Sequence, residues 1–325
     1  MKRKLLVLEL WRVGDLAIAT PFLQAASQHF DVTLLAQPVA QTLHGRFFPF
    51  VKLVPFVAPW TAFYHKYQLW KWPWSKMINL CRHLRAEKFD VAVSARWDTR
   101  EHLLMWFFGA RTRLAFPRLG SQFLLTHSLA RLSPLAHRYE DWWVAAQAIG
   151  LQMPARKELP LPPARKERVV LVHTGAALSV RVWPLERYHS VVQRLRKLGF
   201  FVRVACDANQ REWWSQHAEK DIFVPQSIGE LLELLDQSGV YLGNDSGPGH
   251  LAAIIGIPTF TIFGPQLPEW FAPLHPAAVW VEGKPCPYKQ CFDYCRFPVP
   301  HCLYDTTEEE IWGKLQSFVQ RNCPR

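Results

Sequence analysis

The densest group of chemically versatile residues lies in one segment, YLGNDSGPGHLAAIIGIPTFTIFGP, residues 241–265. A polar turn containing Asp245, Ser246 and Gly247 separates a strand-like apolar run from a helix-like one. Pro248 suits the first turn of a helix, because its missing N–H would be unpaired there anyway. The N–H groups and positive dipole end of such a helix bind anions, and glycine lets a phosphate approach closely. The segment predicts an anion site; a capped strand–turn–helix junction is the alternative.

A second candidate for chemistry is Asp15, which follows the first apolar run of the chain and precedes a helix-like run. A carboxylate on such a turn can act as a general base if its pKa suits the reaction. Asp between a strand and a helix is also a preferred N-cap residue. Position alone leaves both roles for Asp15 open.

Four of the seven cysteines gather near the C-terminus, at Cys286, Cys291, Cys295 and Cys302. Cysteine thiolates are common ligands of structural zinc. The spacings of four, three and six residues differ from the usual paired Cys-x-x-Cys knuckles. A structural zinc site is therefore one hypothesis for this segment, beside a metal-free structural role.

The elements that position these residues follow a pattern that starts twice. Residues 4–10 form an apolar run, and residues 16–29 follow with apolar side chains at helical spacing. Residues 169–172 repeat the apolar run, and a helix-like stripe begins near Pro184. Further buried strands are expected at 31–35, 89–94, 200–205, 240–242 and 259–263.

Residues 154–168, PARKELPLPPARKER, are rich in proline and charge, as is typical of a linker. We therefore predict two domains, 1–160 and 161–325. Alternating strands and helices predict an α/β fold with parallel sheets covered by helices on both faces. Ligands in such folds bind beyond the carboxyl ends of the strands, and two such domains leave a cleft between them. Residues 305–318 predict a capped C-terminal helix, with Asp305 or Thr306 before the acidic first turn.

Composition limits the function classes. The 325 residues are 49% hydrophobic, which is enough for a sizeable core, and the net charge of +11 favours anionic partners. The apolar start is short and interrupted by Glu9, and no apolar stretch is long enough to span a membrane, so we expect neither a signal peptide nor a spanning helix. A cytoplasmic location is the expectation for a chain with so few cysteines. No Gly-x-Gly-x-x-Gly follows either first strand, which argues against an NAD enzyme.

Three blocks of residues add more specific information: Arg12-Val13-Gly14-Asp15-Leu16 with Thr20-Pro21, His173-Thr174-Gly175 with Arg181-Val182-Trp183-Pro184, and Asn244-Asp245-Ser246-Gly247-Pro248-x-His250-Leu251-Ala252-Ala253 with Gly256-Ile257-Pro258 and Phe263-Gly264-Pro265. In this order they resemble motifs of the heptosyltransferase family, glycosyltransferase family 9, over nearly the whole chain. The third block is the most specific. The resemblance implies a GT-B architecture with two Rossmann-like domains, an architecture in which a C-terminal helix often packs back on the first domain.

It also implies inverting, metal-independent sugar transfer without a cofactor, usually from ADP-heptose to the inner core of lipopolysaccharide. Asp15 matches the proposed base of the family. The donor would contact Thr174, Arg181, Asp245, Ser246, Gly247, Pro248 and His250. The family often has Lys at position 181 and Met at 249; Arg181 keeps the charge and suits bidentate phosphate binding. The chain contains no Asp-x-Asp pair of the kind that holds the ion in metal-dependent glycosyltransferases.

Two regions of the first domain are candidates for acceptor contacts. Arg96 and Asp98 follow a predicted strand, so they would reach the cleft and bind acceptor phosphate or other polar groups; a solvated run of surface charges is the alternative. Residues 46–76 combine many aromatic and basic side chains. Such a composition suits contact with an anionic membrane that carries a lipid-linked acceptor, although large aromatics also fill protein cores.

Other functions remain open at this point. A nucleotide-sugar epimerase of the same fold would need no separate acceptor. A non-catalytic basic protein that binds membranes or nucleic acid would also match the charge. Because no nucleic-acid motif is present and the basic residues are dispersed, we do not expect a nucleic-acid partner. A nucleotide-sugar donor and a glycolipid or oligosaccharide acceptor are the expected partners.

Overall fold

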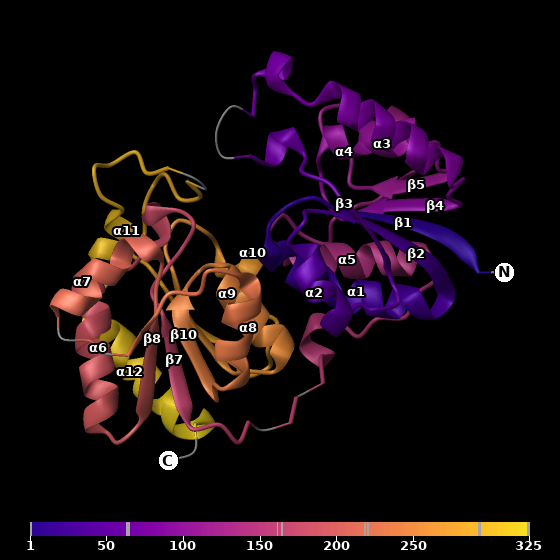
Figure 1. Ribbon diagram of the computed structural model, residues 1–325. Helices are drawn as coiled ribbons and strands as arrows, with labels where there is room; N and C mark the ends of the chain where they lie inside the picture. The colour runs from indigo at the N-terminus through magenta and orange to yellow at the C-terminus, as the bar shows by residue number, and fades with distance from the viewer. Residues whose placement is uncertain are drawn as a thin grey trace. The chain divides into compact units, whose positions relative to one another are not determined.

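The computed structural model describes residues 2–62, 66–160, 162–163, 165–217, 219, 221–291 and 294–323. The chain divides into two compact units, Met1–Arg156 and Lys157–Arg325, close to the boundary predicted from the proline-rich linker. Each unit contains one six-stranded sheet and is described by itself (Figure 1).

The sheet of the first unit is parallel throughout, in the order β3-β2-β1-β4-β5-β6. The centre of β1, residues 5–8, is apolar and fully buried, as expected of a central strand with both faces covered. The strands are β1 (Arg3–Glu9), β2 (Phe30–Ala36), β3 (Lys52–Pro55), β4 (Val91–Ser94), β5 (Thr112–Ala115) and β6 (His127–Ser128).

Helices cover both faces of this sheet. In Figure 1, α3 and α4 lie above the strands, and α1, α2 and α5 lie below them. Side chains of α3 and α4, including Met77, Leu84 and Met105, share one buried core with Leu6 and Leu8 of β1. The helices are α1 (Val13–His29), α2 (Ala40–Phe47), α3 (Trp74–Ala86), α4 (Thr99–Phe107) and α5 (Arg138–Ala148), with short 3-10 helices at Pro59–Thr61, Leu69–Lys71, Ser121–Leu124 and Arg156–Glu158.

The second unit repeats the arrangement. Its parallel sheet has the order β12-β11-β10-β7-β8-β9. Counted from the first strand of each unit, both sheets therefore have the Rossmann order 3-2-1-4-5-6, read from one edge or the other. The strands are β7 (Val169–His173), β8 (Phe201–Ala205), β9 (Ile222–Phe223), β10 (Val240–Asn244), β11 (Thr259–Phe263) and β12 (Val279–Glu282).

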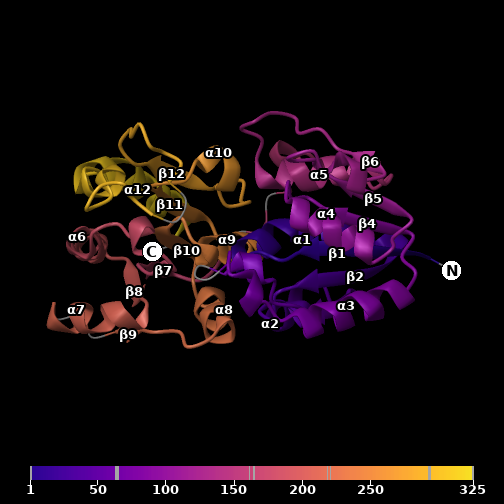
Figure 2. The same cartoon turned by 90° about the horizontal axis from the view of Figure 1, so that it is seen from above.

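In the second unit, α6 and α12 lie on one side of the sheet and α8 on the other (Figure 2). Trp183, Tyr188 and Phe318 are among the side chains that fill the core between α6, α12 and the strands. The helices are α6 (Leu185–Lys197), α7 (Arg211–Gln216), α8 (Ile228–Asp236), α9 (Gly247–Ile255), α10 (Pro268–Phe271), α11 (His301–Tyr304) and α12 (Glu308–Asn322), with 3-10 helices η5 (Ser179–Arg181) and η6 (Ala208–Gln210).

The predicted α/β class and both strand–turn–helix starts are confirmed. The C-terminal helix also forms, but its N-cap is Thr307, whose side chain accepts a hydrogen bond from the Glu310 N–H. The predicted caps were one or two residues too early, because Thr306 instead donates its hydroxyl to the Cys302 carbonyl. This helix contacts α6 and β12 of its own unit; its packing on the first domain stays a prediction.

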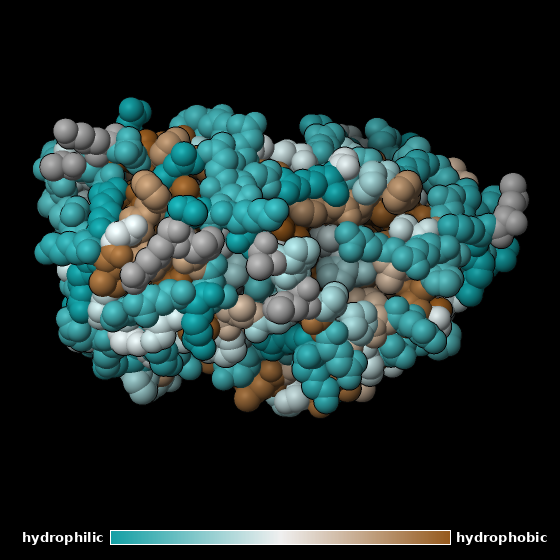
Figure 3. All heavy atoms as spheres, turned by 90° about the horizontal axis from the view of Figure 1, so that it is seen from below, coloured by the Kyte–Doolittle hydropathy of each residue, from teal (hydrophilic) through white to brown (hydrophobic). Residues whose placement is uncertain are grey.

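Surface character agrees with the composition. On the face shown in Figure 3 most residues are hydrophilic, and the hydrophobic ones form separate patches between them. Within the described part of the chain, no helix is both long and apolar enough to cross a membrane.

Candidate functional site

The predicted site residues follow the two central strands of each sheet, between which the strand order reverses. This position is the topological switch point. In the order 3-2-1-4-5-6 this switch point lies between the first and fourth strands, where ligands of open α/β sheets bind. In the first unit it lies between β1 and β4, and Asp15 and Arg96 come after these strands. In the second unit it lies between β7 and β10, and Arg181 and Asp245 come after these.

Asn244, the last residue of β10, fixes the geometry of the switch point in the second unit. Its side chain is fully buried and donates to the Thr174 carbonyl over 2.9 Å. Its Oδ1 accepts from the Trp183 backbone N–H at 3.0 Å and from the Tyr188 hydroxyl at 2.9 Å. One amide therefore joins the end of β10 to the loop after β7 and to the start of α6.

The turn after Asn244 brings a cation to the start of α9. Arg181 Nη1 lies 3.6 Å from Asp245 Oδ2, and the Asp245 side chain is 5% exposed whereas that of Arg181 is 25% exposed. Ser246 is the N-cap residue of α9, with Gly247 and Pro248 as its first two residues. The accessible guanidinium and the positive end of the helix together suit an anionic group such as a phosphate.

Thr174 lies at this switch point with its side chain directed inward. The residue is fully buried, and its hydroxyl donates to Gln210 Oε1 at 2.9 Å and accepts from Trp214 Nε1 at 3.3 Å. Its carbonyl accepts from Asn244 and Gln210. The structure thus gives Thr174 a positioning role in the loop; its contact with a donor stays a prediction.

A tyrosine missed by sequence reasoning borders the turn. Tyr241 is fully buried, and burial raises the pKa of its hydroxyl. A Cβ added at Gly249 would lie 3.3 Å from the Tyr241 ring, so the tyrosine fills the space beside that glycine. His250, the fourth residue of α9, is also buried. His173 at the end of β7 is buried as well, and burial lowers its pKa.

In the first unit, Asp15 is the third residue of α1 and contacts Arg12 and Arg96. Its Oδ2 accepts from the Arg12 backbone N–H at 3.2 Å, which caps the helix start. Its Oδ1 forms an ion pair with Arg96 Nη2. The Asp15 side chain remains 15% exposed.

Arg96 is largely buried in the first unit, so it is not part of a solvated charge run. Its side chain is 12% exposed and its guanidinium carbon lies 5.0 Å from the centre of the Trp11 ring. Asp98 is 9% exposed and caps α4 by accepting from the Arg100 N–H at 2.9 Å. Both Asp98 oxygens also accept from the Arg100 side chain, at 2.8 and 2.6 Å. An acceptor contact stays a prediction for Arg96 and Asp98 alike.

Two buried glutamates beside this ion pair were missed from the sequence. Burial raises the pKa of Glu9 to about 7, although Arg96 at 3.9 Å opposes the shift. Burial also raises the pKa of Glu101 to about 8. Glu101 accepts from Trp11 Nε1 at 2.9 Å and from Ser94 Oγ at 2.5 Å. The signal for Glu9 was present, as an acid directly after the apolar residues 5–8 of β1.

A further basic residue, Arg138 at the start of α5, lies close enough to these groups to influence them. It donates to the Ala95 carbonyl at 2.9 Å and to Asp141 Oδ2 at 2.6 Å. Burial, followed by the charge of Arg96, lowers the pKa of Arg138 to about 10. The switch point of the first unit therefore contains a partly exposed carboxylate beside a buried network of charged and polar groups.

A family model described as glycosyltransferase family 9 (heptosyltransferase) matches residues 77–298. The chain belongs to glycosyltransferase family 9. The family model covers the donor-side blocks predicted from the sequence, including Arg181 and the turn at Asp245.

Individual relatives of this family 9 member are distant. Lipopolysaccharide heptosyltransferase 1 of Pseudomonas aeruginosa is 25% identical over 228 residues, which cover 69% of this chain and 59% of that protein. A family 9 glycosyltransferase from Veillonella parvula has a TM-score of 0.76 at 16% identity, with 99% of both chains covered. The E. coli heptosyltransferase WaaC with ADP has a TM-score of 0.71 at 14% identity, with 97% and 99% covered. At these identities the two structures show that the fold is shared.

Proposed function

We propose that this family 9 member is an inverting, metal-independent glycosyltransferase that moves a sugar from a nucleotide donor to an acceptor hydroxyl. The observation that carries the proposal is the distribution of charge over the two switch points: a partly exposed carboxylate in the first unit and a partly exposed arginine beside a helix start in the second. Direct displacement at an anomeric carbon needs such a pair of functions, a base on one face and a stabilised leaving group on the other.

On the donor side, the developing negative charge belongs to the leaving nucleoside diphosphate. Arg181 and the start of α9 would stabilise it, because fixed charges and dipoles aimed at developing charge lower the barrier. Asp245 keeps the guanidinium in place from its buried side. The chain has no Asp-x-Asp pair to hold a divalent ion, which favours this protein-based stabilisation.

On the acceptor side, Asp15 would accept the proton of the attacking hydroxyl. Its partial exposure allows a hydroxyl to approach, and its ion pair with Arg96 holds the carboxylate in place. When Asp15 accepts the proton, Arg96 loses its charged partner at that position. Arg96 still has a carboxyl neighbour in Glu9, at 3.9 Å. Arg96 and Asp98 are the proposed acceptor-side residues.

We propose ADP-heptose as the donor and a lipopolysaccharide core as the acceptor. The family description names heptosyltransferases, the Pseudomonas relative is a lipopolysaccharide heptosyltransferase, and the WaaC structures contain ADP and ADP-2-deoxy-2-fluoro heptose. These names support the donor class; the sugar and the linkage are what the experiment decides.

The direct test is release of a nucleoside diphosphate from a panel of nucleotide sugars, with and without a lipopolysaccharide core acceptor. We expect ADP release from ADP-heptose that requires the acceptor, together with a product of inverted anomeric configuration. Conversion of the donor to another nucleotide sugar without acceptor would instead identify an epimerase. If a nucleoside diphosphate is released only after a divalent ion is added, whichever donor is used, metal independence is contradicted.

We also propose that residues 46–76 contact an anionic membrane surface that presents the acceptor; residues 63–65 of this range lie outside the described part of the chain. Part of the range is core, since Phe48 and Trp60 are 2% and 3% exposed. Another part is at the surface: Tyr67 and Trp70 are both 77% exposed, and Lys71 beside them is exposed. Exposed aromatic and basic side chains suit the interface of an anionic bilayer. The location on the cytoplasmic face remains a prediction.

Vesicle co-sedimentation tests this contact. Binding to vesicles with anionic lipid should fall several-fold when Tyr67→Ser and Trp70→Ser are combined, and should weaken with salt because Lys71 contributes. Phe201→Ser is the matched control, since Phe201 is 66% exposed but belongs to the second unit. Equal binding of parent and double variant, or equal binding to neutral vesicles, would contradict the proposal.

A further inference from the structure

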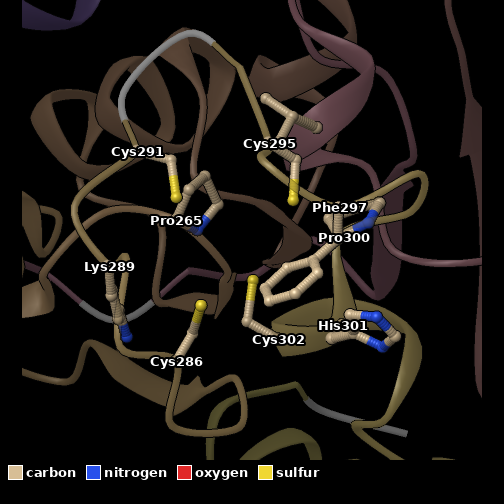
Figure 4. Close-up of a pocket in the computed structure, with 10 residues that line it drawn as sticks. Pro265, Cys286, Lys289, Cys291, Cys295, Phe297, Pro300, His301 and Cys302 are labelled. Atoms are coloured by element: carbon tan, nitrogen blue, oxygen red, sulfur yellow. The ribbon is translucent and has the colours of Figure 1, made fainter.

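Four cysteine side chains of the second unit line one pocket between the end of β12 and α11. They are Cys286, Cys291, Cys295 and Cys302, and their sulfur atoms point toward a shared space (Figure 4). The pocket holds about 280 Å³ of space between protein atoms, its open side included. None of these cysteines forms a disulfide in the described part of the chain. The other three cysteines, Cys81, Cys206 and Cys323, do not line it.

The backbone around the pocket is tightly packed, so at least one thiol has a fixed place. A Cβ added at Gly283 would lie 2.2 Å from the Cys302 carbonyl, and one added at Gly264 would lie 2.7 Å from Leu303. The Cys302 carbonyl also accepts from the Lys284 N–H at 2.9 Å. Two glycines therefore allow α11, with Cys302, to lie directly against the ends of β11 and β12.

The remaining lining is largely apolar, while Cys286, Cys291 and Cys295 stay partly exposed and Cys302 is buried. Val180, Pro265, Phe297 and Pro300 provide an apolar wall. Cys291 Sγ donates to the Tyr288 carbonyl at 3.0 Å, and Cys295 Sγ donates to the Val299 carbonyl at 3.7 Å. Lys289 also lines the pocket and would offset part of the negative charge of thiolates there.

We propose that these four thiols bind an iron–sulfur cluster as thiolates. A single zinc ion holds each sulfur at about 2.3 Å, which places tetrahedral sulfurs only about 3.8 Å apart. Among the described residues, no three His, Cys, Asp or Glu side chains are grouped closely enough to hold one metal ion. Four thiols that line one pocket without forming a single-ion site suit a cluster, because its iron and sulfide core separates the ligands.

Binding is an exchange of ligands in which each thiol loses its proton to solvent and donates a sulfur lone pair to iron. It needs no oxidation of the protein. The cluster would be structural for the donor side, because Val180 lines the pocket and Arg181 is the next residue. This role is compatible with metal-independent sugar transfer, in which no ion contacts the reacting atoms.

The test is to purify the full chain without oxygen and to measure iron, zinc and acid-labile sulfide per chain. We expect about two to four iron atoms with an equal amount of sulfide, and the broad visible absorption of a cluster. Combined Cys291→Ser and Cys295→Ser should reduce iron and sulfide to background. Cys206→Ser is the matched control, because Cys206 is buried in the same unit outside the pocket.

The outcomes separate this proposal from the proposed transferase function. One zinc per chain without sulfide, or a metal-free chain with cysteines joined as disulfides under the same anaerobic conditions, would overturn the cluster. Circular dichroism of the double variant shows whether it folds, and metal content of the parent chain decides the matter if it does not. Acceptor-dependent ADP release is measured on the same samples and can succeed or fail whatever the metal content.

Discussion

The two switch points carry the same pair of side chains in opposite order. In the first unit the aspartate follows the first strand and the arginine follows the fourth, as Asp15 and Arg96. In the second unit the arginine follows the first strand and the aspartate follows the fourth, as Arg181 and Asp245. The same topology therefore places an aspartate and an arginine side by side in both units. The strand that each residue follows is exchanged between the two units.

The two pairs also differ in which side chain is exposed to solvent. In the second unit the aspartate is almost fully buried and the arginine is a quarter exposed, so the site presents a positive charge. In the first unit both partners are similarly exposed, and two buried glutamates lie beneath them. The first site can therefore exchange a proton at its surface, whereas the second can hold an anion. Fold alone would not have distinguished these roles.

The largest expected effect in this comparison comes from Asp15→Asn. Removing a general base lowers turnover by about 10²–10⁴-fold, while the donor site in the other unit keeps its arginine and helix start. We therefore expect kcat to fall to that extent and donor affinity, measured by calorimetry, to stay within a few-fold of the parent.

The exposed Asp31→Asn variant, at the start of β2, is the matched control for charge removal and should behave as the parent. Thermal denaturation of both variants checks that the amide oxygen introduced by Asp15→Asn still accepts from the Arg12 N–H and caps the helix. A turnover rate within a few-fold of the parent would remove Asp15 from the role of base.

The next largest effect is expected from Arg181→Ala. A hydrogen bond to a charged group is worth about 1.5–3 kcal/mol, so loss of the guanidinium should raise the donor KM by about 10–100-fold. Arg181→Lys should lose less, because it keeps the charge without the bidentate geometry. Steady-state kinetics with varied donor measure both, and Arg321→Ala on the exposed side of α12 is the control. If acceptor KM rises instead of donor KM, the assignment of the two units is reversed.

The smallest expected effect concerns Glu101, which distinguishes the first switch point. With a pKa of about 8 in the folded chain, this acid keeps its proton at pH values where the unfolded chain has released it. Stability of the folded state should therefore fall as pH rises from about 5 to about 8. Glu101→Gln stays neutral and can still accept from Trp11, so it should reduce the fall in melting temperature. Equal pH dependence in parent and variant would contradict the raised pKa; the remaining slope belongs to Glu9.

The sequence was sufficient for the features that depend on local pattern. Long apolar strands such as β1 and β10, and the turn from Asn244 to Pro248, have a period and residue types that predict them directly. Short strands such as β6 and β9, of two residues each, were missed because they lack enough residues to show a period.

Contacts between distant residues could not be predicted in the same way. Asp15 and Arg96 are 81 residues apart, and their pairing depends on β1 and β4 being neighbours, which no local pattern specifies. Asn244 was quoted only as part of a motif, whereas its three hydrogen bonds make it the organising residue of its site. Likewise, the inward hydroxyl of Thr174 follows from Gln210 and Trp214, which belong to another helical segment.

The contact between Tyr241 and the space beside Gly249 has an evolutionary consequence. Since a side chain at position 249 would meet the tyrosine ring, a larger residue there requires a smaller one at 241 or a displaced ring. The methionine often found at position 249 in the resembling family should therefore occur together with a reduced side chain at 241. Substitutions at positions 241 and 249 should then occur together when family 9 sequences diverge.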